Sequence, residues 1–405
     1  MTILRDYRQF QGLHWETGAV RNSFDYRGFR APHTGRPYSE ALLLGVSGGA
    51  VVGYFTFAYQ GYPPQARILT RNTFDPWDTM LSRLGVAQNI HQTASPERAR
   101  ANLIAALDEG APPIVWADMW SLPHNALAYD PGMWAMFPLV VYGYDEAAGV
   151  VHMADRARVG LTCTPGELAA ARGRVKQDKH RFITLEAPDV DKLAAAVSAG
   201  IWDCLRLYTE APPKGAKHNF GLAALRFWAE LLTRPKARLS WERVFPAGPK
   251  MLDGLTSAFT DIALFGKEGG AERHVYADFL DEAATILGRP GLGEAAAHFR
   301  AAAVAWNVLG RTLLPDEIAP FGETRALLLE RHARFLSEGN AARPRLAAID
   351  ARLAAIRAAL AADFPLTTPQ VEAHRAAVAA QVMAVHDIEA TAVAALREAM
   401  AAGRS

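Results

Sequence analysis

The spacing of hydrophobic and polar residues divides the chain into two parts near residue 190. In the first part, short runs rich in β-branched and aromatic residues are bounded by turn residues, which is typical of strands. These predicted strands cover residues 112–120, 137–145, 149–155 and 180–186. Helical spacing alternates with them at about 15–28, 39–47, 75–84 and 96–109, and a Thr-Pro-Gly-Glu cap at 164–167 predicts one more helix. The first part is therefore predicted to be α+β.

After residue 190, nearly every segment places apolar residues three or four positions apart, which predicts an all-α region. Near its end, Leu346–Leu360 carries a heptad pattern, and valines at spacings of seven follow two prolines. We therefore predict an α+β domain at 1–189, a helical domain at 190–340 and a C-terminal helical hairpin at 341–405. The apolar seam of this hairpin either packs within the chain or forms a homodimer interface.

Composition narrows the class of protein. Half of the 405 residues are apolar, and 43 Lys and Arg nearly balance 42 Asp and Glu. No long basic run is present, so nucleic acid is not expected as a partner. The first residues lack the features of a signal peptide, and the longest apolar runs are interrupted by Gly and Ser. We expect a cytoplasmic protein without a membrane partner.

The glycine-rich stretch "GVSGGAVVG" at 45–53 has no Lys-Ser or Lys-Thr after it and precedes an apparent strand. It is therefore interpreted as a tight bend at Gly48 and Gly49 and not as a phosphate-binding loop. The only two cysteines, Cys163 and Cys204, predict neither a disulfide framework nor a zinc site. Cys163 is interpreted as a small buried or edge residue and Cys204 as a core residue. No cofactor and no metal are expected.

The polar start of the first predicted helix is the strongest candidate for a functional site. Its first turn holds His14, Trp15, Glu16 and Thr17. Cysteine acyl-transfer enzymes place their nucleophile at such a position, because the positive end of the helix dipole lowers the pKa of a thiol. The base, a histidine, then comes from a strand of the following sheet and is oriented by an Asp or Asn on the next strand.

The residues around this helix resemble the N-terminal domain of the butirosin biosynthesis protein H family. For that family we expect a His-Cys-x-Ser/Thr-x-Ala-Leu-Arg-Asn opening, then Ser-Glu and Gly-Gly before an aromatic strand. Matching residues are His14, Glu16, Thr17, Ala19, Arg21, Asn22, Ser39, Glu40, Gly48, Gly49, Tyr54 and Phe55. The "VWADMWSLPH" segment and the hairpin at 139–155 match as well, and the helical part resembles the domain of unknown function that follows in the family. The resemblance covers roughly residues 10–335.

The resemblance implies a papain-like (C39-peptidase-like) cysteine-protease fold that is used for acyl transfer. Members of the family move an acyl group from a carrier-protein thioester to an amine through a Cys-His-Asp site. The partners implied are an acyl carrier protein or acyl thioester and a small amine. In this chain the nucleophile position holds Trp15, the base position holds Phe137, and the third position holds Asp155.

Neither Trp15 nor Phe137 can perform the chemistry of the residue it replaces, and loss of one member of such a site costs about 10⁴–10⁶ in turnover. We predict that the two rings pack together or line an apolar cleft. The chain is then a homologue that has lost the Cys-His chemistry and binds a ligand or partner. The alternative is an active enzyme with a rebuilt site around His14, Glu16 and Asp155, and a third reading is a scaffold. A structural role for His14, Glu16 and Thr17 at the helix start also stays open.

Two further residues, His124 and Asp118, complete the candidate substrate-binding set of Trp15, Thr17, Phe137, Asp118 and His124. His124 lies in the loop before the Phe137 strand, and the sequence does not fix its direction. Asp118 interrupts an apolar strand and is expensive to bury without a partner, so Arg21 or Arg71 is expected to pair with it.

Overall fold

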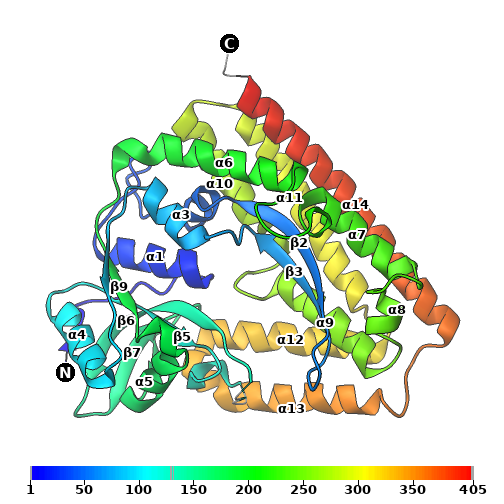
Figure 1. The fold of residues 1–405 in the computed structure, drawn as a ribbon, viewed down its shortest axis with the longest axis horizontal. Helices are drawn as coiled ribbons and strands as arrows, with labels where there is room; N and C mark the ends of the chain where they lie inside the picture. The colour runs from blue at the N-terminus through cyan, green and yellow to red at the C-terminus, as the bar shows by residue number, and fades with distance from the viewer. Residues whose placement is uncertain (1, 128–129, 131, 403–405) are drawn as a thin grey trace. The chain divides into compact units, whose positions relative to one another are not determined.

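The computed structural model describes residues 2–127, 130 and 132–402. The chain forms two compact units, and each is gathered from several segments (Figure 1). The N-terminal unit contains Met1–Leu43, Leu81–Lys192 and Glu330–Ile349. The helical unit contains Leu44–Met80, Leu193–Leu329 and Asp350–Ser405. The domains predicted from the sequence are continuous stretches of chain, whereas each observed unit is made of three separate stretches. Residues 403–405 of the predicted hairpin lie outside the described residues.

An antiparallel sheet forms the centre of the N-terminal unit. Its strand order is β4-β9-β5-β6-β7-β8, and β1 pairs with β6. The strands are β1 (Thr2–Ile3), β4 (Gln88–His91), β5 (Ile114–Asp118), β6 (Met136–Asp145), β7 (Val150–Ala154), β8 (Leu161–Cys163) and β9 (Phe182–Leu185). The four strands predicted from the sequence are confirmed as β5, β6, β7 and β9, with their ends shortened or shifted by one to two residues.

The β6–β7 hairpin brings two candidate positions to one end of the sheet. Asp145 pairs with Val150 beside the turn, and Val140 pairs with Ala154 farther along. Because the strands are antiparallel, the start of β6 and the end of β7 meet at the same end of the hairpin. Phe137 and Asp155 therefore emerge near each other.

Among the described residues before 190, five α-helices match the predicted helical ranges. They are α1 (Trp15–Tyr26), α2 (Glu40–Val46), α3 (Pro76–Arg83), α4 (Pro96–Asp108) and α5 (Pro165–Gly173). α1 packs on β6, and α5 packs on β5. The predicted capping box of α5 is confirmed, because Thr164 Oγ1 accepts from the main-chain N–H of Glu167 at 3.2 Å and a Glu167 carboxylate oxygen accepts from that of Thr164 at 2.7 Å.

Helices account for the chain from residue 193 onward, as predicted. They are α6 (Leu193–Thr209), α7 (Gly221–Thr233), α8 (Trp241–Val244), α9 (Pro249–Ala263), α10 (Arg273–Leu287), α11 (Gly291–Leu313), α12 (Ala319–Glu338), α13 (Arg343–Ala359) and α14 (Thr368–Ala401). The helical unit also contains a two-stranded sheet of β2 (Ala50–Phe57) and β3 (Gln65–Arg71), which packs against α7 and α9. The helical unit is therefore largely but not entirely helical, because β2 and β3 from the first part of the sequence belong to it.

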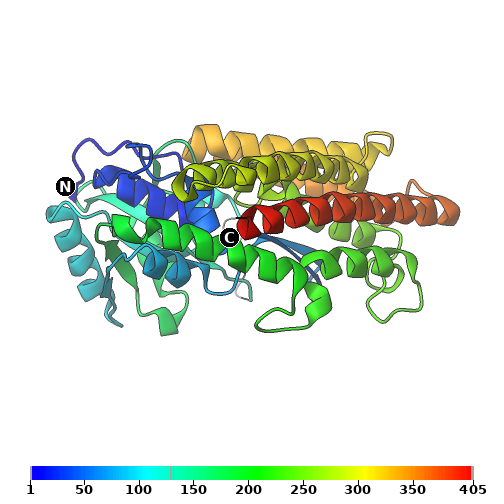
Figure 2. The same cartoon turned by 90° about the horizontal axis from the view of Figure 1, so that it is seen from above.

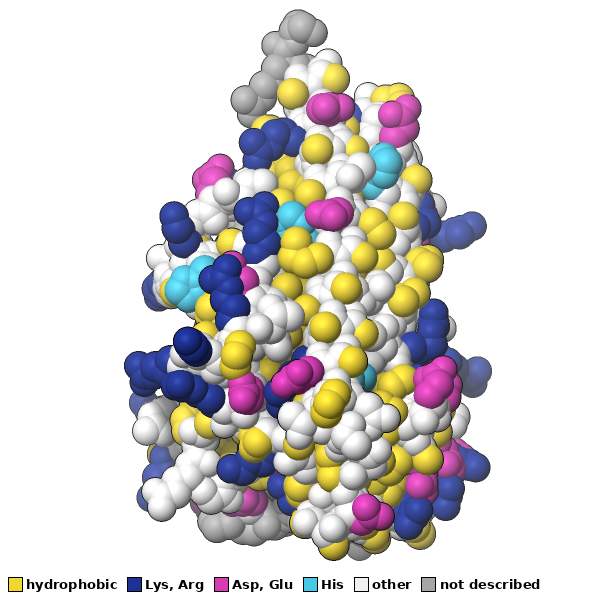
Figure 3. Space-filling model, turned by 90° about the vertical axis from the view of Figure 1, so that its right-hand side faces the viewer, with side chains coloured by type: hydrophobic (Ala, Val, Ile, Leu, Met, Phe, Trp, Pro, Cys, Tyr) yellow, Lys and Arg dark blue, Asp and Glu magenta, His cyan; other side chains and the backbone are white. Residues whose placement is uncertain are grey.

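The valine stripe of the tail is buried within the helical unit. Val371, Val378 and Val385 are at most 4 % exposed, and α14 packs along α11 and α7 (Figures 1 and 2). Exposed positions of α14 carry small residues such as Ala376 and Ala380. Figure 3 shows the side of the protein on which α14 lies, where apolar side chains are interspersed with charged ones. The apolar stripe is thus used inside the chain, and the homodimer stays a prediction.

The glycine-rich stretch forms the tight bend expected of it. Gly48 and Gly49 have φ values of 113° and 74°, in the region that favours glycine. A Cβ atom at Gly48 would lie 2.0 Å from Nδ2 of Asn72, so the space is also closed to a side chain. Among the described residues, no helix combines the length and apolar character needed to cross a membrane.

Candidate functional site

Two aromatic rings occupy the positions that the resemblance assigns to the nucleophile and the base. Trp15 is the first residue of α1, and Phe137 is the second residue of β6. Their ring centroids lie 4.2 Å apart with an interplanar angle of 18°, so the rings stack. Trp15 is only 3 % exposed. The predicted packing of these two residues is confirmed.

The polar residues at the start of α1 hold the helix in place. His14 is the N-cap, and its Nδ1 accepts a hydrogen bond from the main-chain N–H of Glu16 at 3.3 Å. Thr17 Oγ1 donates to Glu40 Oε1 at 2.8 Å, and the main-chain N–H groups of Leu13 and His14 donate to the same carboxylate. His14 and Thr17 thus have a structural role at the helix start, His14 as the cap and Thr17 as a partner of Glu40. Sequence reasoning missed the function of Glu40.

Asp155 lies directly after β7, is buried, and contacts the side chains of His124 and Arg156. Its Oδ2 lies 3.2 Å from Nε2 of His124, and its Oδ1 accepts from Nε of Arg156 at 3.3 Å. Burial alone raises the pKa of this carboxyl, but the charge of Arg156 and the hydrogen bond with His124 outweigh burial and hold the pKa well below its ordinary value. His124 is completely buried and points to Asp155, which settles the direction that the sequence left open.

Arg156 connects the carboxylate to the aromatic stack, and sequence reasoning missed it. Its guanidinium carbon lies 4.4 Å from the ring centroid of Trp15 and 4.7 Å from that of Phe335. Both distances are within the range of a cation–π interaction. Nη2 of Arg156 also donates to Oδ1 of Asn125 at 2.5 Å. We call Trp15, Phe137, Arg156 and Phe335 the aromatic–arginine cluster.

A segment from far along the sequence supplies Phe335 and packs against the same region. Arg158 donates its main-chain N–H to the carbonyl of Leu336 at 2.8 Å. The side chain of Asn340 pairs with both main-chain groups of Thr162, at 2.9 and 2.8 Å. Residues Glu330–Ile349 therefore belong to the N-terminal unit, and their end of α12 closes over the cluster.

Asp118 is completely buried at the end of β5 and satisfied by groups close to it. Its Oδ2 accepts from Ser121 Oγ at 2.7 Å, and its Oδ1 accepts from the main-chain N–H of Ala135 at 2.9 Å. The guanidinium Nε of Arg174 lies 3.9 Å from Oδ2. These contacts tie Ser121 and Ala135 to the end of β5.

The predicted partners of Asp118 were wrong. Arg21 donates to Gln11 Oε1 at 2.8 Å, and Arg71 pairs with Glu272 inside the helical unit. The physical reason is that Arg21 lies on the exposed side of α1, while the strand of Arg71 belongs to the β2–β3 sheet. Arg174, at the end of α5, is the cation that the fold brings near β5.

Neither cysteine is poised for nucleophilic chemistry. Cys163 and Cys204 are buried, and burial raises the pKa of each thiol to about 12. The thiol of Cys204 donates to the carbonyl oxygen of Ala50 at 3.1 Å. The interpretation of both residues as buried is confirmed. Within the described part of the chain, no group of three or more His, Cys, Asp or Glu could hold a metal ion.

The protein therefore consists of an α+β domain with an antiparallel sheet, followed by a largely helical region. The model of butirosin biosynthesis protein H, N-terminal, matches residues 14–156, and a domain of unknown function matches residues 167–320. The chain therefore belongs to the butirosin biosynthesis protein H-like family, a biosynthesis-associated acyltransferase-like family. The identification made from the sequence is confirmed. No curated protein matches the chain significantly.

Proposed function

We propose that this chain is a non-catalytic member of its family, which binds an acylated carrier protein or acyl thioester without forming a thiol-bound intermediate. The observation that carries the proposal is the stack of Trp15 on Phe137. Acyl transfer needs a nucleophile about 3–3.5 Å from the thioester carbonyl. An indole and a phenyl ring offer neither a nucleophile nor a base at these two positions.

The state of Asp155 supports the same proposal. In a Cys-His-Asp site, the third residue accepts a hydrogen bond from the base and stabilises its cation. Here the bonds of the carboxylate go to His124 and Arg156, and its lowered pKa keeps it from accepting a proton near neutral pH. The alternative is acyl transfer through His14, Glu16 and Asp155. This alternative is disfavoured because the carboxylate of Asp155 is already paired with Arg156 and Nδ1 of His14 serves as a helix cap.

The test measures turnover and covalent intermediates together. The full chain is incubated with a butyryl thioester of N-acetylcysteamine and a small primary amine, and the amide product and the intact protein mass are followed. We expect no acylated protein and no amide above the uncatalysed rate. Binding of a butyrylated carrier protein is measured in parallel and is expected.

Variants separate the proposal from its alternative. Glu16→Gln and Asp155→Asn remove the acid–base groups of the rebuilt site, and Glu398→Gln on α14 is the matched control because its side chain is exposed. Turnover by the natural chain that falls in the first two variants and persists in the control would establish the alternative. An acyl adduct on the natural chain would refute the proposal directly.

A further inference from the structure

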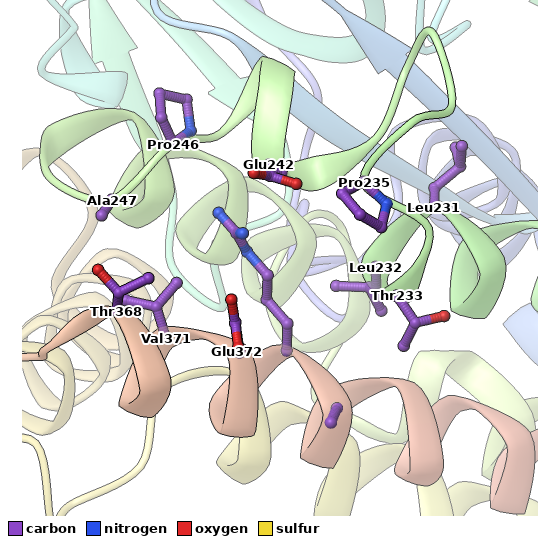
Figure 4. Close-up of a pocket in the computed structure, with 12 residues that line it drawn as sticks. Leu231, Leu232, Thr233, Pro235, Glu242, Pro246, Ala247, Thr368, Val371 and Glu372 are labelled. Carbon is purple, nitrogen blue, oxygen red and sulfur yellow. The ribbon is translucent and has the colours of Figure 1, made fainter.

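A cavity of about 380 Å³ lies in the helical unit, bordered by α7, by α8 and by the start of α14 (Figure 4). Its volume falls within the range of about 300–1,000 Å³ that is typical of sites for small molecules. Much of its wall is apolar and comes from Leu231, Leu232, Pro235, Pro246 and Val371. None of these residues belongs to the site around Trp15.

The floor of the cavity contains a buried cation with an unused donor. Arg375 is 8 % exposed, and its Nη2 donates to the carbonyl oxygens of Phe245 at 2.9 Å and Trp241 at 3.5 Å. Its Nε has no hydrogen-bond partner. A buried donor without an acceptor is costly, because it has lost its water and gained nothing in return. Among the described residues, no carboxylate contacts the guanidinium of Arg375, which lines the cavity.

Two carboxylates line the same cavity. Figure 4 shows Glu242 from α8 and Glu372 from α14 on opposite sides of it. Both side chains are exposed, and in the part of the chain that the structure describes neither forms a hydrogen bond or an ion pair. Burial lowers the pKa of Arg375, and the negative charges of the two glutamates partly oppose this effect. The three side chains therefore interact electrostatically without forming an ion pair.

We propose that this cavity binds a small zwitterion, namely a compound with an ammonium group and a carboxylate on an aliphatic body. The carboxylate lies against the guanidinium of Arg375, and the ammonium group lies near Glu242 and Glu372. The aliphatic body packs against the leucine and valine side chains. The proposal goes beyond the proposed function and does not depend on it, because all of its residues lie in the helical unit.

Both charges of the ligand are needed for electrostatic complementarity. A simple carboxylate would satisfy Arg375 but would approach two negative groups. A simple amine would satisfy the glutamates and leave the guanidinium of Arg375 without an anionic partner. A compound that carries both groups gives the arginine and the glutamates a partner of opposite charge and adds no net charge.

Arg375 also has a structural role, since its two carbonyl acceptors lie at α8 and directly after it. Cations near a helix C-terminus interact favourably with the last carbonyl groups. This role explains Nη2 but neither the unpaired Nε nor the unpaired glutamates. It does make removal of the arginine side chain a poor test, because α8 would lose its cap. The two glutamates are the better targets, since they have no partner to lose.

The test is calorimetric titration of the full chain with three matched compounds. L-Leucine carries both charges, L-leucinamide lacks the carboxylate, and 4-methylpentanoate lacks the ammonium group. We expect L-leucine to bind with a Kd of about 1 mM or lower and both analogues to bind at least about tenfold more weakly. Absence of L-leucine binding up to about 10 mM, or equal binding by either analogue, would overturn the proposal.

Variants assign the binding to this cavity. Glu242→Gln and Glu372→Gln are each expected to weaken L-leucine binding by about three- to tenfold, since each removes one of two charges near the ammonium group. Glu398→Gln lies on the same helix α14 but is not among the cavity residues, and it should leave the Kd unchanged. Equal affinity of all three variants and the natural chain would place the compound elsewhere and refute the site.

Discussion

Replacement of Arg156 by Met should destabilise the N-terminal unit, because it leaves the carboxylate of Asp155 buried without its main cation. The side chain of Asp155 is 3 % exposed and that of Arg156 is 12 % exposed, so water screens this pair weakly. Met keeps much of the volume and removes the charge, and the change therefore isolates the electrostatic role of the guanidinium.

The expected cost follows from the contacts that are lost. Removing one partner of a buried ion pair costs about 3–5 kcal/mol. The hydrogen bond between Asp155 and His124 survives, which favours the lower end of that range. Loss of the cation–π contacts with Trp15 and Phe335 adds about 1 kcal/mol. We therefore expect Arg156→Met to lower the free energy of unfolding of this unit by about 3–5 kcal/mol.

Hydrogen exchange followed by mass spectrometry is the suitable assay, because two compact units need not unfold in one step. Peptides from α1, β7 and the end of α12 report the N-terminal unit. Arg300→Met is the matched control, since Arg300 is 44 % exposed in its pairs with Asp278 and Asp281 and should cost about 1 kcal/mol or less.

A double-mutant cycle with Asp155→Asn provides the decisive comparison. Once the carboxylate is neutral, Arg156→Met should cost about 2 kcal/mol less than in the natural chain. A coupling energy near zero would refute the reasoning, and so would a cost below about 1 kcal/mol for Arg156→Met alone.

Two other predictions follow from pKa shifts. Asp155 has a lower pKa in the folded chain than its unfolded value of about 3.9, so its contribution to stability is complete above about pH 5 and declines as the pH falls toward the folded pKa. The difference in Tm between the natural chain and Asp155→Asn should shrink below about pH 4, and a constant difference down to pH ~3 would contradict this. Burial raises the pKa of Cys163 and Cys204 to about 12. A disulfide reagent that reacts with thiolates should therefore modify neither cysteine of the native chain at about pH 8 and both cysteines after unfolding. A rapidly reacting native thiol would show that one of them is accessible.

Local signals in the sequence predicted much of the fold. The capping residues of α5 lie within four positions of one another, and the turn between β6 and β7 is equally local. Such features depend on neighbouring residues, so periodicity and turn chemistry suffice to find them. The pairing of Trp15 with Phe137 needed the family resemblance as well, because their contact joins a helix and a strand more than a hundred residues apart.

The rest of the site depends on contacts that no local pattern encodes. Phe335 reaches Arg156 from α12, and the apolar spacing of α12 is the same as that of any amphipathic helix. Asp118 gave a correct warning that a buried carboxylate needs partners, but only the fold decides that Arg174 and not Arg21 is near. The same holds for β2, which the sequence indicated as an apparent strand without indicating that it joins the helical unit, and β3 was not predicted.

The aromatic–arginine cluster and Asp155 form one packing arrangement. Phe137 offers Asp155 no hydrogen-bond donor, and an unpaired buried carboxylate would be costly. His124 and Arg156 supply the missing donors, and Trp15 and Phe335 supply ring faces for the guanidinium. Under the proposed function, Trp15→Cys alone would remove a support of Arg156 without supplying a base. Phe137→His alone would place an imidazole beside a carboxylate that is already paired with His124 and Arg156. We therefore expect thiol chemistry to require at least both changes, together with release of Asp155 from Arg156.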